Sequence, residues 1–281
     1  MQENIQVNEL PSSDLHFISS EVRKDVIKML GKANSGHPGG SLSIVDILVT
    51  LYYRVMKVDP KKPDWEDRDR LVLSKGHGCP ALYSVLARRG YFNMDQLGTL
   101  RQLGSILQGH PDMKRTPGID VSVGSLGQGL SVAVGLALGA RLKNKDYKIY
   151  AIIGDGEMQE GQIWEALMAS IHYKLDNLTI VLDYNKLQID GTNNEVLSLG
   201  NVKDRMQAFG FNVYEIDGHN YDEIYGALSA LAISQKPKFI IAHTIKGKGV
   251  SFMENKVEWH GKAPNNEEIT KALIELGGKS I

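Results

Sequence analysis

From residue 127 onward, short apolar runs alternate with helical segments, and this alternation restricts the chain to few folds. The apolar runs cover residues 147–153, 178–183, 211–216 and 238–243, and the helical patterns cover 128–143, 160–174, 202–209 and 221–234. Strands that alternate with helices form parallel sheets with helices on both faces. Uninterrupted apolar runs are typical of strands buried on both faces. The sequence therefore predicts an α/β fold whose ligands bind at the carboxyl ends of the strands.

The part of the chain before residue 127 is predicted to be mostly helical. A helix over residues 14–32 follows from apolar residues at spacings of three and four, among them Leu15, Val22 and Val26. Further helices are expected over 43–56, 81–89 and near 266–276. Gly90 suits the end of the helix over 81–89. Residues 58–70 are rich in proline and charge and predict a surface loop. We expect residues 1–13 to form a loose arm and residues 14–281 to form one domain.

Charge and apolar content argue against several classes of protein. With 32 basic and 33 acidic residues the net charge is −1, which does not favour nucleic-acid binding. The most apolar stretch, residues 126–140, is too short for a membrane helix and contains four glycines. The polar N-terminus does not resemble a secretion signal. The single cysteine, Cys79, permits no disulfide within the chain, which fits a cytoplasmic protein.

Two predicted strands end in residues that can bind a metal ion. Gly154-Asp155-Gly156 follows the strand over 147–153, and Asn185 follows the strand over 178–183. Carboxylate and amide oxygens suit Mg²⁺, which usually shares its coordination sphere with phosphate oxygens. The glycines allow the backbone to come close to a diphosphate. The alternative is that Gly-Asp-Gly only forms a turn, and the asparagine after the neighbouring strand argues against it.

Four of the eight histidines lie in loops beside glycine or proline. These are His37, His77, His110 and His260. A neutral histidine can donate or accept a proton, which suits the hydroxyls of a sugar. Each histidine alone would more often be a surface or cap residue, but four in similar loops favour a binding role. No Cys/His spacing supports a zinc site. His16 and His172 fall inside predicted helices and are expected to be structural, whereas His219 and His243 follow strands, and the sequence leaves their role open.

Together these motifs resemble those of transketolases, in the same order, over about residues 14–265. The resemblance implies the three-layer thiamine diphosphate-binding fold with a mostly parallel central sheet, and within it the diphosphate-binding (PP) domain. It implies thiamine diphosphate as cofactor with Mg²⁺, or another divalent cation such as Ca²⁺ or Mn²⁺. Asp155 and Asn185 match side-chain ligands of that metal, and the carbonyl of Leu187 matches the third protein ligand.

The same resemblance assigns expected roles around the cofactor. His37 and His260 match positions that contact the donor sugar and assist proton transfer, and His110 matches one near the two-carbon unit. The expected cofactor-binding residues are His77, Gly124, Ser125, Leu126, Asp155, Gly156, Asn185, Ile189 and His260. Glu160 and Glu165 match acidic positions near the subunit interface of the family, although exposed helix carboxylates are an equal alternative.

A full transketolase resembles this chain followed by two more domains, of which the first supplies a glutamate that activates the cofactor. Only 38 residues follow residue 243, too few for such a domain. We therefore expect a separate partner subunit with the pyrimidine-binding and C-terminal domains, in a heterotetramer of two copies of each chain. The expected activity is transfer of a two-carbon ketol unit from a ketose phosphate to an aldose phosphate, as in the pentose phosphate pathway, with neither nucleic acid nor membrane as a partner.

Three alternatives remain at this point. The chain could serve a transketolase-like enzyme that acts on an unusual sugar, such as a sulfosugar or an apiose derivative, because such enzymes differ mainly in contacts that the partner supplies. It could belong to another split thiamine diphosphate enzyme, such as the α subunit of a 2-oxo acid dehydrogenase, but that class lacks the four histidine loops. A scaffold without activity would need none of these residues.

Overall fold

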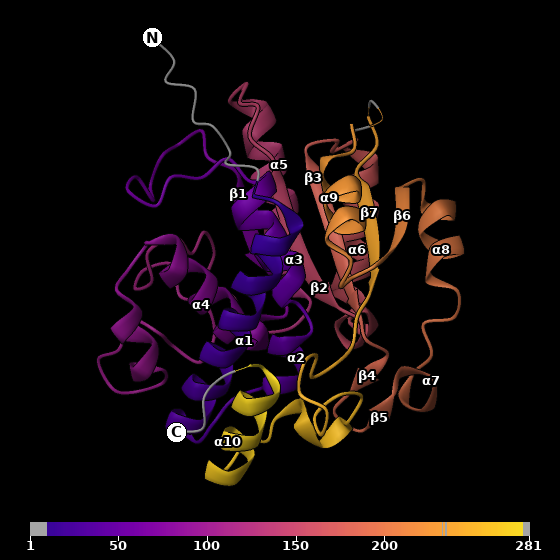
Figure 1. Cartoon of the computed structure of the whole chain (residues 1–281). Helices are drawn as coiled ribbons and strands as arrows, with labels where there is room; N and C mark the ends of the chain where they lie inside the picture. The colour runs from indigo at the N-terminus through magenta and orange to yellow at the C-terminus, as the bar shows by residue number, and fades with distance from the viewer. Residues whose placement is uncertain (1–9, 232, 234, 278–281) are drawn as a thin grey trace.

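The computed structural model describes residues 10–231, 233 and 235–277, and its centre is a five-stranded parallel sheet (Figure 1). The strands are β1 (Arg70–Leu73), β2 (Ile149–Gly154), β3 (Leu178–Tyr184), β6 (Asn212–Asp217) and β7 (Lys238–His243), in the spatial order β1-β2-β3-β7-β6. A small antiparallel hairpin of β4 (Leu187–Gln188) and β5 (Gly191–Thr192) follows β3. The predicted α/β class and parallel sheet are confirmed.

Successive residues of the strands point into two separate cores. In β2, Ile149, Ala151 and Ile153 pack on one face, with helices α5 (Gln128–Leu142), α6 (Gly161–His172) and α8 (Val202–Phe209). Tyr150 and Ile152 pack on the other face, with α1 (Ser12–Ala33), α3 (Val45–Thr50), α4 (Cys79–Arg89), α9 (Tyr221–Ser229) and α10 (Asn266–Glu275). The molecule is thus a three-layer sandwich. Strands β2, β3 and β7 are buried on both sides as expected, whereas β6, at the edge of the sheet, is mostly half-buried or exposed.

The expected helix over 43–56 is divided. The structure has α2 (Pro38–Leu42), then α3, and then a π-helical turn, η1 (Leu51–Val55). The Ser43 hydroxyl donates to the carbonyl of Gly40 and to Asp183. A serine that bonds elsewhere competes with regular helix formation, so this turn is fixed by tertiary contacts that no helical pattern reveals.

Strand β1 was not expected, because it has four residues and follows the Pro- and charge-rich loop. It becomes a strand because Leu71 and its neighbours pair with β2. The expected helix over 221–234 ends earlier, at Ser229. Of the expected arm, residues 1–9 lie outside the described residues, and α1 begins at Ser12, two residues ahead of the predicted start.

The remaining short helices are η2 (Gly76–Gly78), η3 (Met94–Thr99), η4 (Gly156–Gln159), α7 (Asn193–Val196) and η5 (Val257–His260). Several of them lie at the carboxyl ends of strands, where they shape the site. Across the part of the chain that the structure describes, no helix combines the length and the apolar character needed to cross a membrane.

Candidate active site

A cavity of about 420 Å³ lies at the carboxyl ends of β2 and β3. It brings together segments that are far apart in the chain, since η2, η4, the turn before α2 and the segment around η5 all reach it. Of the residues predicted from the sequence, those that line it are His37, His77, His110, Gly124, Leu126, Asp155, Gly156, Glu160, Asn185, Leu187, Ile189 and His260. Ser125 does not line it and is exposed in the turn before α5.

The three expected metal ligands follow β2 and β3 and line this one cavity. The carboxylate of Asp155 accepts from the backbone N–H of Gly156 at 2.8 Å and from that of Lys186 at 2.5 Å. The second contact holds the carboxylate against the turn that carries Asn185 and Leu187. Asp155, Asn185 and Leu187 therefore line the same space and offer a carboxylate, an amide oxygen and a backbone carbonyl, which is a donor set suited to Mg²⁺.

Asp155 is a buried carboxylate that forms no ion pair within the described residues. Burial and the neighbouring charge of Asp183 raise its pKa to about 6. A cation in the cavity would stabilise the ionised form of Asp155, because an opposite charge nearby favours the charged state. The electrostatics of this position therefore fit a bound divalent ion.

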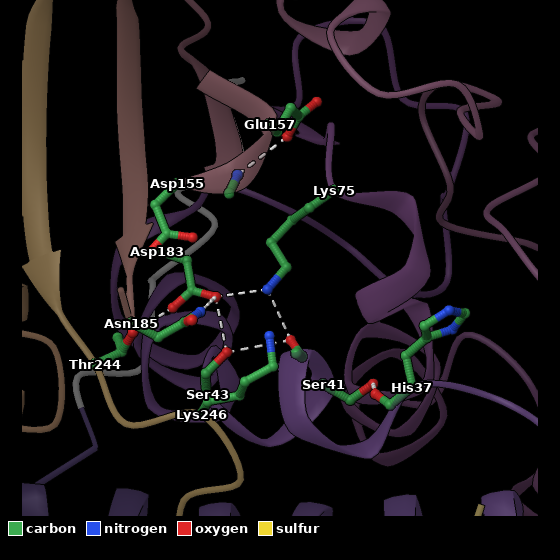
Figure 2. A network of polar contacts seen from close by, with 12 residues as sticks. His37, Ser41, Ser43, Lys75, Asp155, Glu157, Asp183, Asn185, Thr244 and Lys246 are labelled. Atoms are coloured by element: carbon green, nitrogen blue, oxygen red, sulfur yellow. Dashed lines mark hydrogen bonds and ion pairs between the residues drawn. The ribbon is translucent and has the colours of Figure 1, made fainter. Parts of the chain in front are cut away.

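Beneath the cavity, Asp183 is the centre of a buried polar network (Figure 2). Its carboxylate accepts from Lys75 Nζ at 2.5 Å, from Ser43 Oγ at 2.7 Å, from Asn185 Nδ2 at 3.1 Å and from the Thr244 hydroxyl. Burial alone would raise the pKa of Asp183, but the Lys75 ammonium and these hydrogen bonds hold it below its usual value. Because an ionised carboxylate only accepts, the amide nitrogen of Asn185 faces Asp183, and this fixes the orientation of the amide.

Lys246 supplies a buried positive charge to the cavity. It follows β7 and is 2% exposed, and its Nζ donates to the carbonyl of Leu187 at 3.0 Å and lies 3.0 Å from His260 Nδ1. Burial and the charge of Lys75 lower its pKa to about 8. A desolvated ammonium of this kind attracts an anionic ligand strongly, since little water competes for it.

Glu157, 2% exposed, fastens the loops around the cavity. It accepts from Ser74 Oγ at 2.5 Å, from the N–H of Gly127 at 2.9 Å and from that of Gly154 at 3.0 Å. Burial raises the pKa of its carboxyl. These contacts join the ends of β1 and β2 to the start of α5, so the carboxylate holds the loops from which Gly124 and Asp155 project.

Three of the four predicted histidines form a triangle of rings. The ring centroids of His37 and His77 are 5.2 Å apart, those of His37 and His260 are 5.6 Å apart, and those of His77 and His260 are 5.4 Å apart. Among the residues that the structure places, no group of three His, Cys, Asp or Glu side chains could hold a metal ion. The triangle therefore suits hydrogen bonding to a ligand.

The rings of this triangle are uncharged near neutral pH. Burial, with positive neighbours, lowers the pKa of His37 to about 4 and that of His260 to about 3, and it lowers the pKa of His77 well below its usual value. A neutral imidazole donates through one nitrogen and accepts through the other. The cluster can therefore hold several hydroxyls and exchange protons with them.

His110 lies at the outer part of the same cavity, between two glycine-containing loops. A Cβ at residue 76 would lie 3.3 Å from His110 Cδ2, and one at residue 124 would lie 3.8 Å from its Cγ. Glycine at these positions therefore gives the ring room. Burial lowers the pKa of His110, so this ring is also neutral near pH 7.

The histidines left open or judged structural lie elsewhere. His219 Nδ1 is 2.7 Å from Asp46, and its Nε2 accepts from the backbone N–H of Ile245 at 2.9 Å. His243 Nε2 is 2.8 Å from Glu215. His16 and His172 are exposed, and their rings pack against Tyr221 and Tyr173, respectively. None of these four lines the cavity described above, although His16 and His219 border a smaller one of about 290 Å³.

Two buried polar atoms show that the cavity fits a polar ligand. Within the described residues, His37 Nδ1 and Gln188 Nε2 are buried without a hydrogen-bond partner. Buried polar atoms are nearly always paired, and because His37 and Gln188 line the cavity, these two atoms can bond to a polar ligand there. With Lys246 for negative charge and Asp155 for a cation, the residues present fit a diphosphate that carries a divalent metal ion.

Sequence reasoning missed Lys75, Glu157, Asp183 and Lys246 as members of the site. A usable signal existed, because charged residues that directly follow buried strands are costly to bury without a partner. Asp183 is part of the apolar run of β3, and Lys75 stands two residues after β1. Lys75 and Asp183 are each other's partner, however, and they lie 108 positions apart in the chain, so no local pattern relates them.

Comparison with known proteins also indicates a domain that binds a diphosphate. The family described as "Transketolase, thiamine diphosphate binding domain" matches residues 16–280. The chain is 50% identical over 264 residues to the 6-deoxy-6-sulfo-D-fructose transketolase subunit SqwG of Clostridium sp. (strain MSTE9), covering 94% of this chain and 96% of that protein. It is 44% identical to one of the subunits of apulose-4-phosphate transketolase of Phocaeicola vulgatus, with 93% of each chain covered.

Solved structures agree with the fold. Transketolase from Campylobacter jejuni superposes with a TM-score of 0.91 at 38% identity, covering 96% of this chain and 44% of that one. The human transketolase sequence is 38% identical over 258 residues, which are 92% of this chain and 41% of that protein. The chain thus matches the two subunits over nearly their whole length and spans less than half of these longer proteins.

Proposed function

The chain belongs to the transketolase family of thiamine diphosphate binding domains, and from this premise we propose that it is the cofactor-binding subunit of a two-chain transketolase. With its partner it transfers a two-carbon ketol unit from a ketose phosphate to an aldose phosphate. The observation that carries the proposal is the meeting of Asp155, Asn185, Lys246 and the histidine triangle in one cavity. A metal-diphosphate site beside uncharged histidines is the combination that this chemistry requires.

In this proposal Asp155, Asn185 and the carbonyl of Leu187 hold Mg²⁺, and Lys246 binds the diphosphate. Ile189, which is 65% exposed and lines the cavity, packs beneath the cofactor. Thiamine diphosphate, when bound, supplies the nucleophilic carbon and the electron sink for cleaving and forming the carbon–carbon bond. Every other task at the site belongs to side chains of the protein.

The histidines bind and move protons at the sugar. His37 and His260 are uncharged and adjacent, so either can accept the proton of the hydroxyl next to the bond that breaks. His77 and His110 donate to other hydroxyls and orient the sugar. Neutral rings are needed here, because an imidazolium could donate a proton but could not accept one.

A second chain completes the proposed enzyme. It carries the pyrimidine-binding and C-terminal domains that transketolases have in addition to the region matched here, in an assembly of two copies of each chain. Support comes from two relatives of similar length that are named as subunits. A cytoplasmic location is part of the proposal.

The names of the relatives also suggest a class of substrate. Those with 50% and 44% identity are named for a sulfonated fructose and for apulose 4-phosphate. We therefore keep, as a second candidate, a ketose with an unusual anionic end in place of an ordinary ketose phosphate. Both candidates share the two-carbon transfer and the residues named above.

The test is donor-ketose turnover with thiamine diphosphate and Mg²⁺, measured for this chain alone and with its partner. Activity is expected only in the mixture, and a panel of ketose phosphates, sulfofructose and apulose 4-phosphate would rank the substrates. Turnover by the chain alone would sink the two-chain proposal. Tight cofactor binding without turnover of any ketose would overturn the transketolase assignment.

A pair of variants separates the site from the fold. His37→Gln is expected to lower kcat at least about 100-fold, as removal of a proton-transfer group does. His172→Gln is the matched control, because this histidine ends α6 and contacts Tyr173 outside the cavity. Equal losses in the two variants would contradict the role of His37.

A further inference from the structure

Arg101 lies beside the cavity and has no part in the mechanism above. Its Nη1 donates to the hydroxyl of Ser35 at 2.7 Å, two residues before His37. Its Nη2 is 3.4 Å from the carbonyl of Gly109, the residue before His110. One guanidinium therefore contacts both segments that carry proposed active-site histidines.

The structure around Arg101 is built to admit this side chain. A Cβ on residue 109 would lie 3.2 Å from Nε and 3.3 Å from Cζ of Arg101, a tight contact that would push the guanidinium away by a few tenths of an ångström. Arg101 itself has a φ of 61°, a left-handed conformation that is uncommon for residues other than glycine. Its backbone N–H bonds to the carbonyl of Leu107 at 2.9 Å, which closes the loop leading to His110.

The opposite side of the His110 segment is held as well. The buried hydroxyl of Tyr83 lies 3.0 Å from the carbonyls of Gln108 and His110. The segment is therefore fixed between Tyr83 and Arg101, and of these two only Arg101 also contacts the His37 segment.

Arg101 has no carboxylate partner among the residues that the structure describes. None of the ion pairs found in the described ranges of the chain includes Arg101. After burial, its charge is the next cause that lowers the pKa of both His37 and His110. His37 is also faced by the charges of His110, Lys75 and Lys246, whereas for His110 Arg101 is the one charged group with such an effect.

We propose that Arg101 is a positioning residue that joins the His37 segment to the His110 segment and places a fixed positive charge beside both rings. The bridge sets the distance between the two histidines. The charge adds to burial, which is the larger cause, in keeping their rings neutral, so that they remain able to accept protons. The catalytic meaning of this proposal rests on the proposed function, but the bridge and the charge can be tested without it.

The first test follows the histidine ring signals by NMR as the pH of the cofactor-free full chain is changed. Signals of His37 and His110 are assigned with His37→Gln and His110→Gln. In Arg101→Gln the midpoint of His110 is expected to rise by about half a unit or more, because a nearby like charge is lost. In Arg101→Lys the charge remains and the midpoint should stay close to that of the native chain.

The control is Arg115→Gln, which removes the same charge from a neighbouring loop. Arg115 is 55% exposed at its side chain and pairs with Asp112 at 3.6 Å. It should leave both histidine titrations unchanged. An unchanged titration in Arg101→Gln, or an equal shift in Arg115→Gln, overturns the proposal. Circular dichroism of each variant verifies that the chain is folded.

The second test uses the complete enzyme with its partner. Arg101→Gln is expected to lower kcat about tenfold or more and to move the acid limb of the pH–rate profile upward, with the KM for thiamine diphosphate unchanged. Arg101→Lys should restore the pH profile but not the full kcat, since lysine cannot bridge both segments. A raised cofactor KM with an unmoved profile would show a merely structural role. If no ketose is turned over, the NMR titration still decides the proposal.

Discussion

The single residues that matter most in this site are charged groups that have almost no contact with water. Lys75 is 1% exposed and Asp183 is fully buried, and each is the other's counter-ion. Such a pair gains little net stability over an apolar pair, but loss of one partner leaves an uncompensated charge. A change at either residue should therefore disturb the structure beneath the cavity and lower the stability of the whole chain.

Asp183→Asn tests this coupling. The variant keeps the shape of the side chain but removes the charge opposite Lys75, so we expect the free energy of unfolding to fall by about 3–5 kcal/mol. Urea denaturation measures the change. Asp67→Asn is the control, since Asp67 pairs with Lys145 while 53% exposed, and exposed pairs contribute little. Comparable losses in both variants would contradict the importance of burial, and Lys75→Met added to Asp183→Asn should recover part of the stability.

The low pKa of His37 predicts a dependence of stability on pH. The unfolded chain takes up a proton here near pH 6.5, whereas the folded chain does so only near pH 4. The contribution of His37 to the free energy of unfolding should therefore fall as the pH drops from about 6.5 to about 4, and this loss should stop below that range. In His37→Gln this contribution is absent. Urea midpoints of the two proteins across that range should converge on the acid side, and parallel curves would show that His37 is not buried in its neutral form.

Among single residues, the sequence predicted those whose neighbours in the chain form a pattern. Asp155 and Asn185 were found because each follows a strand, and the four histidines because each lies among glycines. Asp183 and Lys246 were missed because their meaning depends on partners in other segments. Such partners exist only in three dimensions, which no spacing along the chain reveals.

Among the elements, the turn after β7 has the most demanding geometry. Three successive residues are fastened to different segments, since Thr244 donates to Asp183, Ile245 to His219 and Lys246 to Leu187. The next residue, Gly247, has a φ of +80° and donates its N–H to the carbonyl of Gly39. The position of Lys246 thus depends on the shape of this turn.

Gly247→Ala is expected to disturb the turn. A Cβ would collide with the backbone of Met253, and the left-handed φ alone costs an alanine about 1–2 kcal/mol. Because Lys246 would be displaced, the Kd for thiamine diphosphate should rise along with the loss of stability. Gly135→Ala in α5 is the matched control, since nothing lies within 4 Å of its added Cβ. It should be neutral or stabilise the chain by up to about 1 kcal/mol. Unchanged cofactor binding in Gly247→Ala would refute the link to Lys246.

Element prediction was best where packing agrees with local pattern. The ranges of α8 and β7 match the predicted ones, because α8 has apolar residues at helical spacing and β7 is a continuous apolar run. β1 and the division between α2 and α3 were not predicted. In both, tertiary contacts decide the structure, namely pairing with β2 and the bonds of Ser43 to the carbonyl of Gly40 and to Asp183.

For the whole molecule, ligand binding should appear as stability. Thiamine diphosphate with Mg²⁺ is expected to raise the Tm of the chain mixed with its partner, by a free energy of about 2.7 kcal/mol at 100 times the Kd. Removal of the metal with a chelator should reverse the shift. Asp155→Ala should abolish it, because the carboxylate that faces the cation is gone. A shift of equal size in Asp155→Ala would place the cofactor elsewhere.

The order of the strands also has a consequence for the newly made chain. β7 is inserted between β3 and β6, so that Asp183 pairs with Ala242 and Tyr184 with His243. Everything from the β4–β5 hairpin to α9 must emerge and fold aside before this closure, and closures over long stretches of chain are slow. A ribosome-bound chain that ends before β7 already contains Asp155, Asn185 and three histidines of the cavity but lacks Lys246 and His260. If the proposed function holds, we therefore expect the cofactor to bind only after β7 and the segment that carries Lys246 and His260 have been made.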